Sequence, residues 1–181
     1  EYDLKLDIGI DELKYQKEKL QEVMPKPLEA SEINVRIGAT WVPKNHIKDF
    51  IVETLKTPAY KSSYIKVHYS EYTSEWNIKG KNIDRNNPLS NMTYGTSRVN
   101  AYKLIEDSLN LRDTRIFDYV LDEEDKKVAV LNKKETMLAA QKQDLLKEEF
   151  KNWIFKEPQR RNDLVKIYNE RFNAIRLREY D

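Results

Sequence analysis

The side chains in this sequence best suited to chemistry are the aromatic and basic residues that alternate through its middle third. Aromatic rings offer stacking faces for bases and cations pair with phosphates, so this combination favours contact with single-stranded or frayed nucleic acid. The candidate contacts surround the expected extended segment and turns of this region, and they are Arg36, Trp41, Lys44, Arg85 and Arg98. The alternative is that the rings pack in the hydrophobic core and the lysines only solubilise the surface.

The motifs of catalytic nucleotide and methyl-donor sites are absent from the sequence. The four glycines lie too far apart for a dinucleotide-type fingerprint. Asn87-Pro88-Leu89 has neither the second proline nor the aromatic residue that an adenine methylase uses, and Gly80-Lys81-Asn82 lacks the remaining parts of a phosphate-binding loop. The acidic run at 122–125 is expected to be a hairpin turn. We therefore expect no catalytic residue and no cofactor in this chain.

The sequence also has few side chains suited to metal binding or redox chemistry. His46 and His68 are the two histidines, and there is no cysteine. Their spacing is not that of a metal site, so we expect no metal ligand. The lack of cysteine excludes disulfides and fits a reducing cytoplasm. The apolar runs are short, which predicts no membrane-spanning segment.

The net charge of +1 is spread unevenly along the chain. Residues 1–32 hold five basic and nine acidic residues, a net −4, whereas residues 33–116 hold thirteen and eight, a net +5. Domains that bind duplex DNA on their own are usually far more basic, because neutralised phosphates supply much of their affinity. Any binding of DNA by this chain alone should therefore be weak.

Apolar periodicity predicts an α+β fold with five helices, of which the last two are long and C-terminal. The helices are expected over residues 10–23, 43–57, 97–109, 133–155 and 158–175. Alternation of apolar and polar residues predicts two hairpins, over 64–78 and 115–131, that make a small antiparallel sheet. An extended segment is expected over 33–37 and a polar loop over 80–92.

These patterns divide the chain into three expected domains. Residues 1–27 would be an N-terminal helix and linker, and residues 28–132 a mixed α+β core. Residues 133–181 would be a C-terminal helical pair.

Four stretches have unusual amino-acid sequences. Their order and spacing together are more specific for a family than any one of them alone. They are LEASEINVRIGATWVP (28–43), NMTYGTSRVNAYKLIEDSLNLR (91–112), VLNKKETMLAAQKQDLLKEEFKNWIFKEPQRR (130–161) and YNERFNAIRLREYD (168–181). In this arrangement the chain resembles a segment of very large bacterial, phage and conjugative-element proteins that join an adenine-specific DNA methylase region to a Swi/Snf-like helicase region. In those proteins the similar segment lies just before the helicase motifs. The resemblance therefore implies that residues 133–181 lead toward a helicase region beyond this chain.

The resemblance implies a parent protein that engages DNA and uses ATP, magnesium and S-adenosylmethionine. It carries no catalytic residue onto this chain, because the matching positions are neither methylase nor helicase motifs. We expect a non-catalytic connector that contacts DNA weakly and couples the flanking methylase and helicase regions. The alternative is an interaction scaffold that positions the two regions without binding nucleic acid. A basic groove lined by the aromatic residues would favour the connector, and an exposed apolar patch on the last two helices would favour the scaffold.

Overall fold

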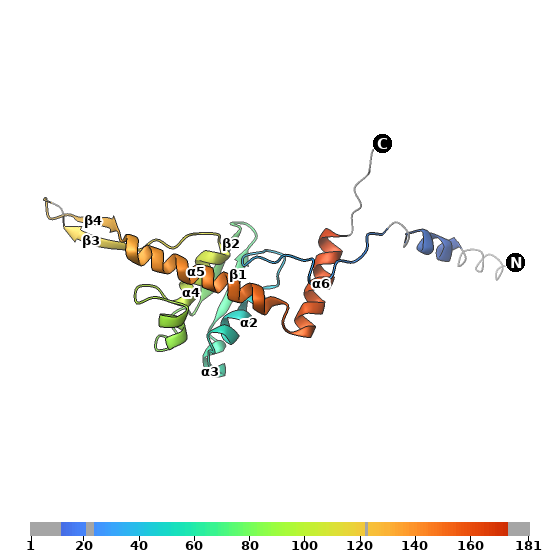
Figure 1. Ribbon diagram of the computed structural model, residues 1–181, viewed down its shortest axis with the longest axis horizontal. Helices are drawn as coiled ribbons and strands as arrows, with labels where there is room; N and C mark the ends of the chain where they lie inside the picture. Colours follow the sequence, from blue (N-terminus) through green and yellow to red (C-terminus); the bar gives the residue numbers. More distant parts are fainter. Residues whose placement is uncertain (1–11, 21–23, 122, 174–181) are drawn as a thin grey trace. The chain divides into compact units, whose positions relative to one another are not determined.

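The computed structural model describes residues 12–20, 24–121 and 123–173. It confirms the α+β fold class, with antiparallel hairpins and two long C-terminal helices (Figure 1). The chain divides into two compact units, one of Glu1–Ile33 with Asn162–Asp181 and one of Asn34–Arg161. The boundaries of these two units differ from those of the three expected domains. The three domains stay a prediction.

The described elements from residue 44 onward follow the predicted order. They are α2 (Lys44–Thr54), α3 (Ala59–Ser62), β1 (Lys66–Ser70), β2 (Glu75–Lys79), η1 (Leu89–Thr93), α4 (Ala101–Leu109), β3 (Phe117–Leu121), β4 (Lys127–Leu131), α5 (Lys133–Ile154) and α6 (Pro158–Phe172). The short helices α3 and η1 add to the five predicted ones. The two hairpins form separate two-stranded sheets, β1–β2 and β3–β4, rather than one sheet.

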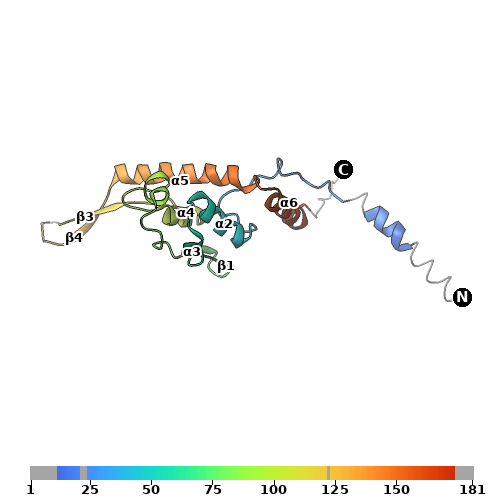
Figure 2. The same ribbon diagram turned by 90° about the horizontal axis from the view of Figure 1, so that it is seen from below.

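Helix α4 forms the centre of the unit Asn34–Arg161. Every residue of α4 except Lys103 is buried, and α4 contacts both α5 and β2. Helix α5 also packs on α2, where the rings of Phe50 and Phe150 meet edge to face with centroids 5.1 Å apart. Figure 2 shows α5 running along one side of α2 and α4. The core of this unit is therefore a helical layer, to which the β1–β2 hairpin is attached through the contacts of β1 with α2 and of β2 with α4.

Polar side chains of α4 cover the outer edge of β2. The Asn110 side chain, at the end of α4, accepts the Trp76 N–H at 2.7 Å and donates to the Trp76 carbonyl at 2.9 Å. Glu106 accepts the Ile78 N–H at 2.7 Å. Backbone groups along the edge of a two-stranded sheet would otherwise lack partners, so these side chains take the place of a third strand.

A second polar cluster joins α4 to α5. Gln143 on α5 is 2% exposed; it donates to the Ser108 hydroxyl at 3.2 Å and accepts the Thr114 N–H at 3.0 Å. The Thr114 hydroxyl donates to the Asp107 carboxylate at 2.8 Å. Buried polar groups stabilise a fold only when they are satisfied, and each of these side chains has a partner. The cluster therefore sets the position of α5 along α4.

The expected extended segment at 33–37 forms no strand, although its alternate residues are buried. Val35 is 5% and Ile37 is 6% exposed, and Gly38 follows with a φ of +90°. A Cβ at Gly38 would lie 2.4 Å from the Leu109 carbonyl oxygen. The segment thus passes the end of α4 so closely that its backbone leaves no room for a side chain at this position.

The Arg160 side chain binds the C-terminal end of α5. Its guanidinium donates to the carbonyls of Ile154 at 3.0 Å and Trp153 at 2.9 Å, and it lies 3.5 Å from the centroid of the Trp153 ring. The last carbonyls of a helix have no partner within the helix. Arg160 supplies partners for two of them, which allows the chain to turn before Pro158 starts α6.

In the unit of Glu1–Ile33 with Asn162–Asp181, residues 12–20 are helical and exposed. The rest of the predicted helix 10–23, and the predicted end of the last helix at residue 175, lie outside the described residues. Asn169 on α6 accepts the Leu28 N–H at 2.8 Å and donates to the Leu28 carbonyl at 3.0 Å. One asparagine side chain therefore holds the segment around Leu28 beside α6.

Alanine at Gly38 should lower the free energy of unfolding by about 2–4 kcal/mol, because the positive φ disfavours a side chain and the Cβ would overlap the Leu109 carbonyl. Urea unfolding followed by circular dichroism measures this change. Lys56→Gly is the control, because Lys56 also has a positive φ and glycine there should change the free energy by less than about 1 kcal/mol. Equal losses in the two variants would contradict the close approach at Gly38.

Glu106 should make part of the stability depend on pH. Burial would raise the pKa of Glu106, but hydrogen bonds from the Ile78 N–H and the Lys81 ammonium hold that pKa below its ordinary value. Since the pKa is lower in the folded state than its unfolded value of about 4.3, the contribution is present above that pH and is lost as pH falls through the folded pKa.

Glu106→Gln should therefore destabilise the protein by about 1–3 kcal/mol at neutral pH and make stability less sensitive to acid. Thermal denaturation at neutral pH and near pH 3 tests this. Glu71→Gln, at an exposed position, should leave the acid sensitivity unchanged. If Glu106→Gln keeps the full loss of stability between the two pH values, another group must cause it.

Candidate interaction site

The five residues predicted to contact nucleic acid do not line one site. Arg36, Lys44 and Arg85 are exposed and Trp41 is half-buried. Arg98 pairs with Asp118 at 2.8 Å and donates to the Phe117 carbonyl at 3.1 Å. Arg36 lines a groove, and the other four are not among its lining residues.

Several other basic residues of the middle region pair with buried carboxylates. Lys61 lies 2.7 Å from Asp84, and this hydrogen bond raises the pKa of Lys61 above its ordinary value. Lys81 lies 2.6 Å from Glu106, and Lys103 lies 2.7 Å from Asp107. These ion pairs use part of the positive charge of the middle region inside the fold, which leaves fewer cations for a ligand.

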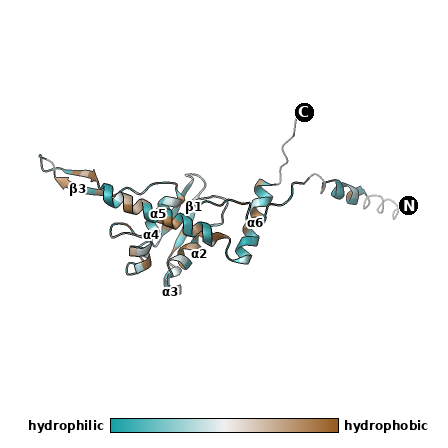
Figure 3. Ribbon diagram, viewed as in Figure 1, coloured by the Kyte–Doolittle hydropathy of each residue, from teal (hydrophilic) through white to brown (hydrophobic). Residues whose placement is uncertain are grey.

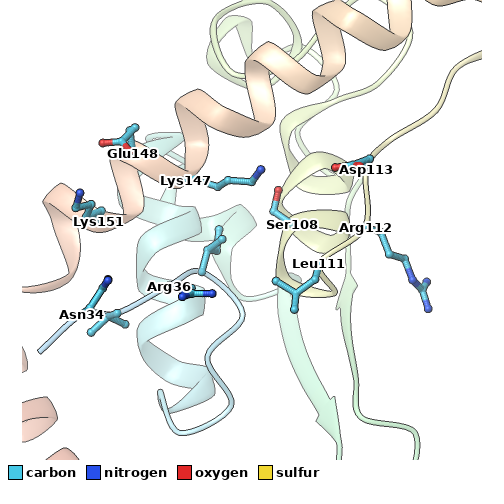
Figure 4. Close-up of a pocket in the computed structure, with 11 residues that line it drawn as sticks. Asn34, Arg36, Ser108, Leu111, Arg112, Asp113, Lys147, Glu148 and Lys151 are labelled. Carbon is cyan, nitrogen blue, oxygen red and sulfur yellow. The ribbon is translucent and has the colours of Figure 1, made fainter.

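The groove beside Arg36 has a volume of about 340 Å³ and lies between the segment 34–37, the end of α4 and α5 (Figure 4). Its lining combines apolar side chains with four cations and two carboxylates, and consists of Asn34, Val35, Arg36, Ile37, Ser108, Leu111, Arg112, Asp113, Lys147, Glu148 and Lys151. None of these residues is aromatic. The groove therefore differs from the expected groove lined by the aromatic residues.

Two of the four cations in the groove are already engaged. Arg112 forms an ion pair with Glu75, and Lys147 lies 2.9 Å from Asp144. Arg36 and Lys151 make no ion pair with another described residue. These two cations are the ones in the groove that could meet an anionic ligand without giving up a partner.

Seven of the exposed large apolar side chains lie on the β3–β4 hairpin, named here the arm. It extends from the N-terminal end of α5 in both views (Figures 1 and 2), and hydropathy colouring shows apolar residues in both of its strands (Figure 3). All residues of its two strands except the half-buried Asp118 are exposed. The exposed large apolar side chains of the arm are Phe117, Tyr119, Val120, Leu121, Val128, Val130 and Leu131.

The strand register divides the arm into two faces. Directly opposed residues share a face, and the pairs Phe117–Leu131, Tyr119–Ala129 and Leu121–Lys127 make what we call the Tyr119 face. The pairs Asp118–Val130 and Val120–Val128 make the opposite face, called the valine face. Each face carries apolar side chains, so the arm does not have the polar outer face of an ordinary surface hairpin.

The edges of the arm differ from the covered edge of β2. The Asn132 N–H donates to the Ile116 carbonyl at 2.8 Å, so the alternation of an antiparallel ladder directs the backbone groups of Phe117 and Tyr119 outward. Arg98 binds the outward carbonyl of Phe117 at the base of the arm. No side chain of α4 covers the rest of the arm in the way that Asn110 covers Trp76.

Charged residues are separated along the arm. Its tip, residues 122–127, holds four acidic and two basic residues, and Glu124 pairs with Lys126. Its base, where β3 begins and α5 starts, carries exposed Arg115, Lys133 and Lys134. The arm therefore runs from a basic base to an acidic tip.

Sequence reasoning predicted the hairpin but missed its exposure. The available signal was the run of residues 127–131, in which the residues that follow Lys127 are all apolar. Such runs are typical of strands covered on both faces, yet the described chain provides no cover. Exposed apolar side chains also occur on the last two helices, at Met137, Leu145 and Phe172.

Among the described residues, no group of three or more histidine, aspartate or glutamate side chains could hold a metal ion. Among the described helices, none is both long and apolar enough to cross a membrane.

Comparison with known proteins gives a family and no nearer relative. Neither the curated proteins nor the solved structures contain a match. Residues 36–174 match the family described as "Domain of unknown function (DUF8437)". The match includes α2 to α6, and therefore the arm and all of the groove lining except Asn34 and Val35. Because it covers most of the sequence, the chain belongs to the family Domain of unknown function (DUF8437).

Proposed function

We propose that this domain is a non-catalytic interaction module that binds a protein partner through the arm. The observation that carries the proposal is the exposure of apolar side chains on both faces of the arm, with Tyr119 72% exposed on one face and Val120 48% exposed on the other. A contiguous exposed apolar surface of this kind marks an interaction site more often than it marks an ordinary surface.

The physical argument concerns the stability of the arm itself. A two-stranded hairpin is at best marginally stable in water, because it buries too little apolar surface to offset the ordering of its backbone. Burial of each exposed aliphatic or aromatic side chain would contribute about 1–2 kcal/mol. A partner that covers the arm would therefore stabilise it as well as bind to it.

The resemblance of the sequence to methylase–helicase proteins suggests which partners to test. On that basis the proposed role is a connector that positions an adenine-specific DNA methylase region and a Swi/Snf-like helicase region in the cytoplasm. ATP, magnesium and S-adenosylmethionine would be bound by those flanking regions and not by this domain.

Val120→Glu tests the proposed docking. It places a charge on an exposed position of the valine face, so it should weaken partner binding at least about tenfold with little effect on the folded core. Isothermal titration of this chain with the methylase region and with the helicase region of a similar parent protein measures the effect. Tyr72→Glu is the matched control, because Tyr72 is 97% exposed in the turn between β1 and β2. Failure of both regions to bind, or binding unchanged by Val120→Glu, would contradict the proposal.

A second candidate function is weak contact with DNA at the groove. It is supported by Arg36 and Lys151, which line the groove and make no ion pair with another described residue. The exposed Lys44 and Arg85 are proposed contacts elsewhere on the surface. Arg98 is a poorer candidate because it already pairs with Asp118. The carboxylates of Asp113 and Glu148 also line the groove and would repel phosphate.

The double variant Arg36→Ala with Lys151→Ala should weaken binding to single-stranded and duplex DNA alike, since phosphate contacts carry no base information. It should also reduce the salt dependence by about two charges. Fluorescence anisotropy with labelled DNA at several salt concentrations measures both quantities. Lys79→Ala, at an exposed position on β2, is the control. If the double variant binds as the unaltered chain does, the groove is not the DNA site.

A further inference from the structure

We infer that the Tyr119 face of the arm packs against the same face of a second copy of this chain, with the two arms antiparallel about a two-fold axis. The inference rests on the proposed function, because it takes the arm as a docking surface and names one occupant for one of its faces. Two-fold association of identical surfaces is the commonest form of homo-oligomer.

The arrangement of side chains on the Tyr119 face suits such a contact. Tyr119 and Ala129 are directly opposite each other in the middle of the arm. In an antiparallel two-fold packing the middle pair of one copy lies over the middle pair of the other. The small Ala129 side chains then leave space in which the two Tyr119 rings can lie offset, the geometry that aromatic pairs favour.

Apolar contacts continue on either side of the middle pair. Leu121 is 62% exposed near the tip, and Phe117 is 42% exposed at the base. An antiparallel arrangement places each tip residue over the base of the other arm, so Leu121 of one copy meets Phe117 of its partner. Because of the two-fold symmetry, this contact between Leu121 and Phe117 occurs two times in the dimer.

Charge selects the antiparallel arrangement over the parallel one. Glu123 and Asp125 at the tip make no ion pair with another described residue, and neither do Lys133 and Lys134 at the base. Parallel arms would bring the two acidic tips together, which is unfavourable, whereas antiparallel arms bring each acidic tip near a basic base. A second copy therefore matches this surface in both charge and shape.

The size of the contact predicts a weak dimer. One face of the arm comprises two strands of five residues each. Two such faces would bury less than the roughly 1,200 Å² of total area that is typical of stable complexes. Dissociation in about the micromolar range is expected for such an interface. The valine face is not used in this contact and stays accessible to the partner of the proposed function.

Sedimentation equilibrium of the 181-residue chain over a wide concentration range tests the inference. We expect a reversible monomer–dimer equilibrium whose dissociation constant rises at least about tenfold in Tyr119→Glu. Tyr72→Glu, on the exposed turn between β1 and β2, should dimerise as the unaltered chain does. Circular dichroism checks that both variants keep the helical core. A chain that stays monomeric at all concentrations would overturn the inference.

Cross-linking locates the contact independently of any disruptive variant. The chain has no cysteine, so Ala129→Cys introduces a single thiol at the middle of the Tyr119 face. A short thiol-reactive cross-linker should join two copies through this position and should not join copies that carry Tyr72→Cys instead. A dimer that forms in solution but is not cross-linked at position 129 would overturn the proposed face.

Charge reversal tests the antiparallel arrangement. Lys133→Glu with Lys134→Glu should weaken the dimer about tenfold, although acidic residues in the first turn of α5 favour the helix itself. Adding Glu123→Lys and Asp125→Lys to the same chain should restore the affinity. If the added lysines weaken the dimer further, the arms are not antiparallel.

The outcomes separate this inference from the proposed function. A monomer that still binds a methylase or helicase region through Val120 would leave the proposed function intact and remove the second copy. A dimer that binds neither region would support the second copy and remove the proposed role as a connector.

Discussion

The structure of the unit Asn34–Arg161 depends on the polar residues at the C-terminal end of α4. Glu106 and Asn110 bind the backbone of β2, and Asp107 belongs to the cluster that includes Gln143 of α5. Partial satisfaction of such a network would cost more than an apolar core, since each buried polar atom needs a partner. The network therefore requires that the β1–β2 hairpin and α5 both take their positions against α4 when the unit folds. Gly38 adds a steric requirement at the same helix end.

This constraint explains why the two hairpins differ. The β1–β2 hairpin has its outer edge bound by α4, and Val67 and Ile78 pack in the core. The arm receives no equivalent support. Arg98 and Asn132 hold Asp118 at its base, beyond which the side chains of both faces are exposed. An apolar sequence and an uncovered position are in conflict within the described chain, and the proposed docking of a protein partner resolves that conflict.

The distribution of cations makes DNA contact the weaker of the two proposals. Lys61, Lys81 and Lys103 pair with carboxylates of the folded core, so part of the positive charge of the middle region supports the fold. In the groove beside Arg36, two cations make no ion pair with another described residue, but two carboxylates also line it. Membership of a family described only as a domain of unknown function is compatible with either role. The arm provides the more specific argument, since its exposure has no explanation within the fold.

The sequence by itself determined the elements that depend on local patterns. Pro43 and Pro158 mark the starts of α2 and α6, and the acidic turn after Leu121 joins two strands, because helix starts and turns are encoded by neighbouring residues. Short local deviations, such as α3 and η1, escaped prediction because they have no long periodicity. Only the tertiary structure decided which apolar residues are buried. Ile78 and Val128 are both apolar residues of strands, but Ile78 is buried and no described residue covers Val128. Burial depends on what residues distant in sequence bring to a surface, and a local pattern does not contain that information.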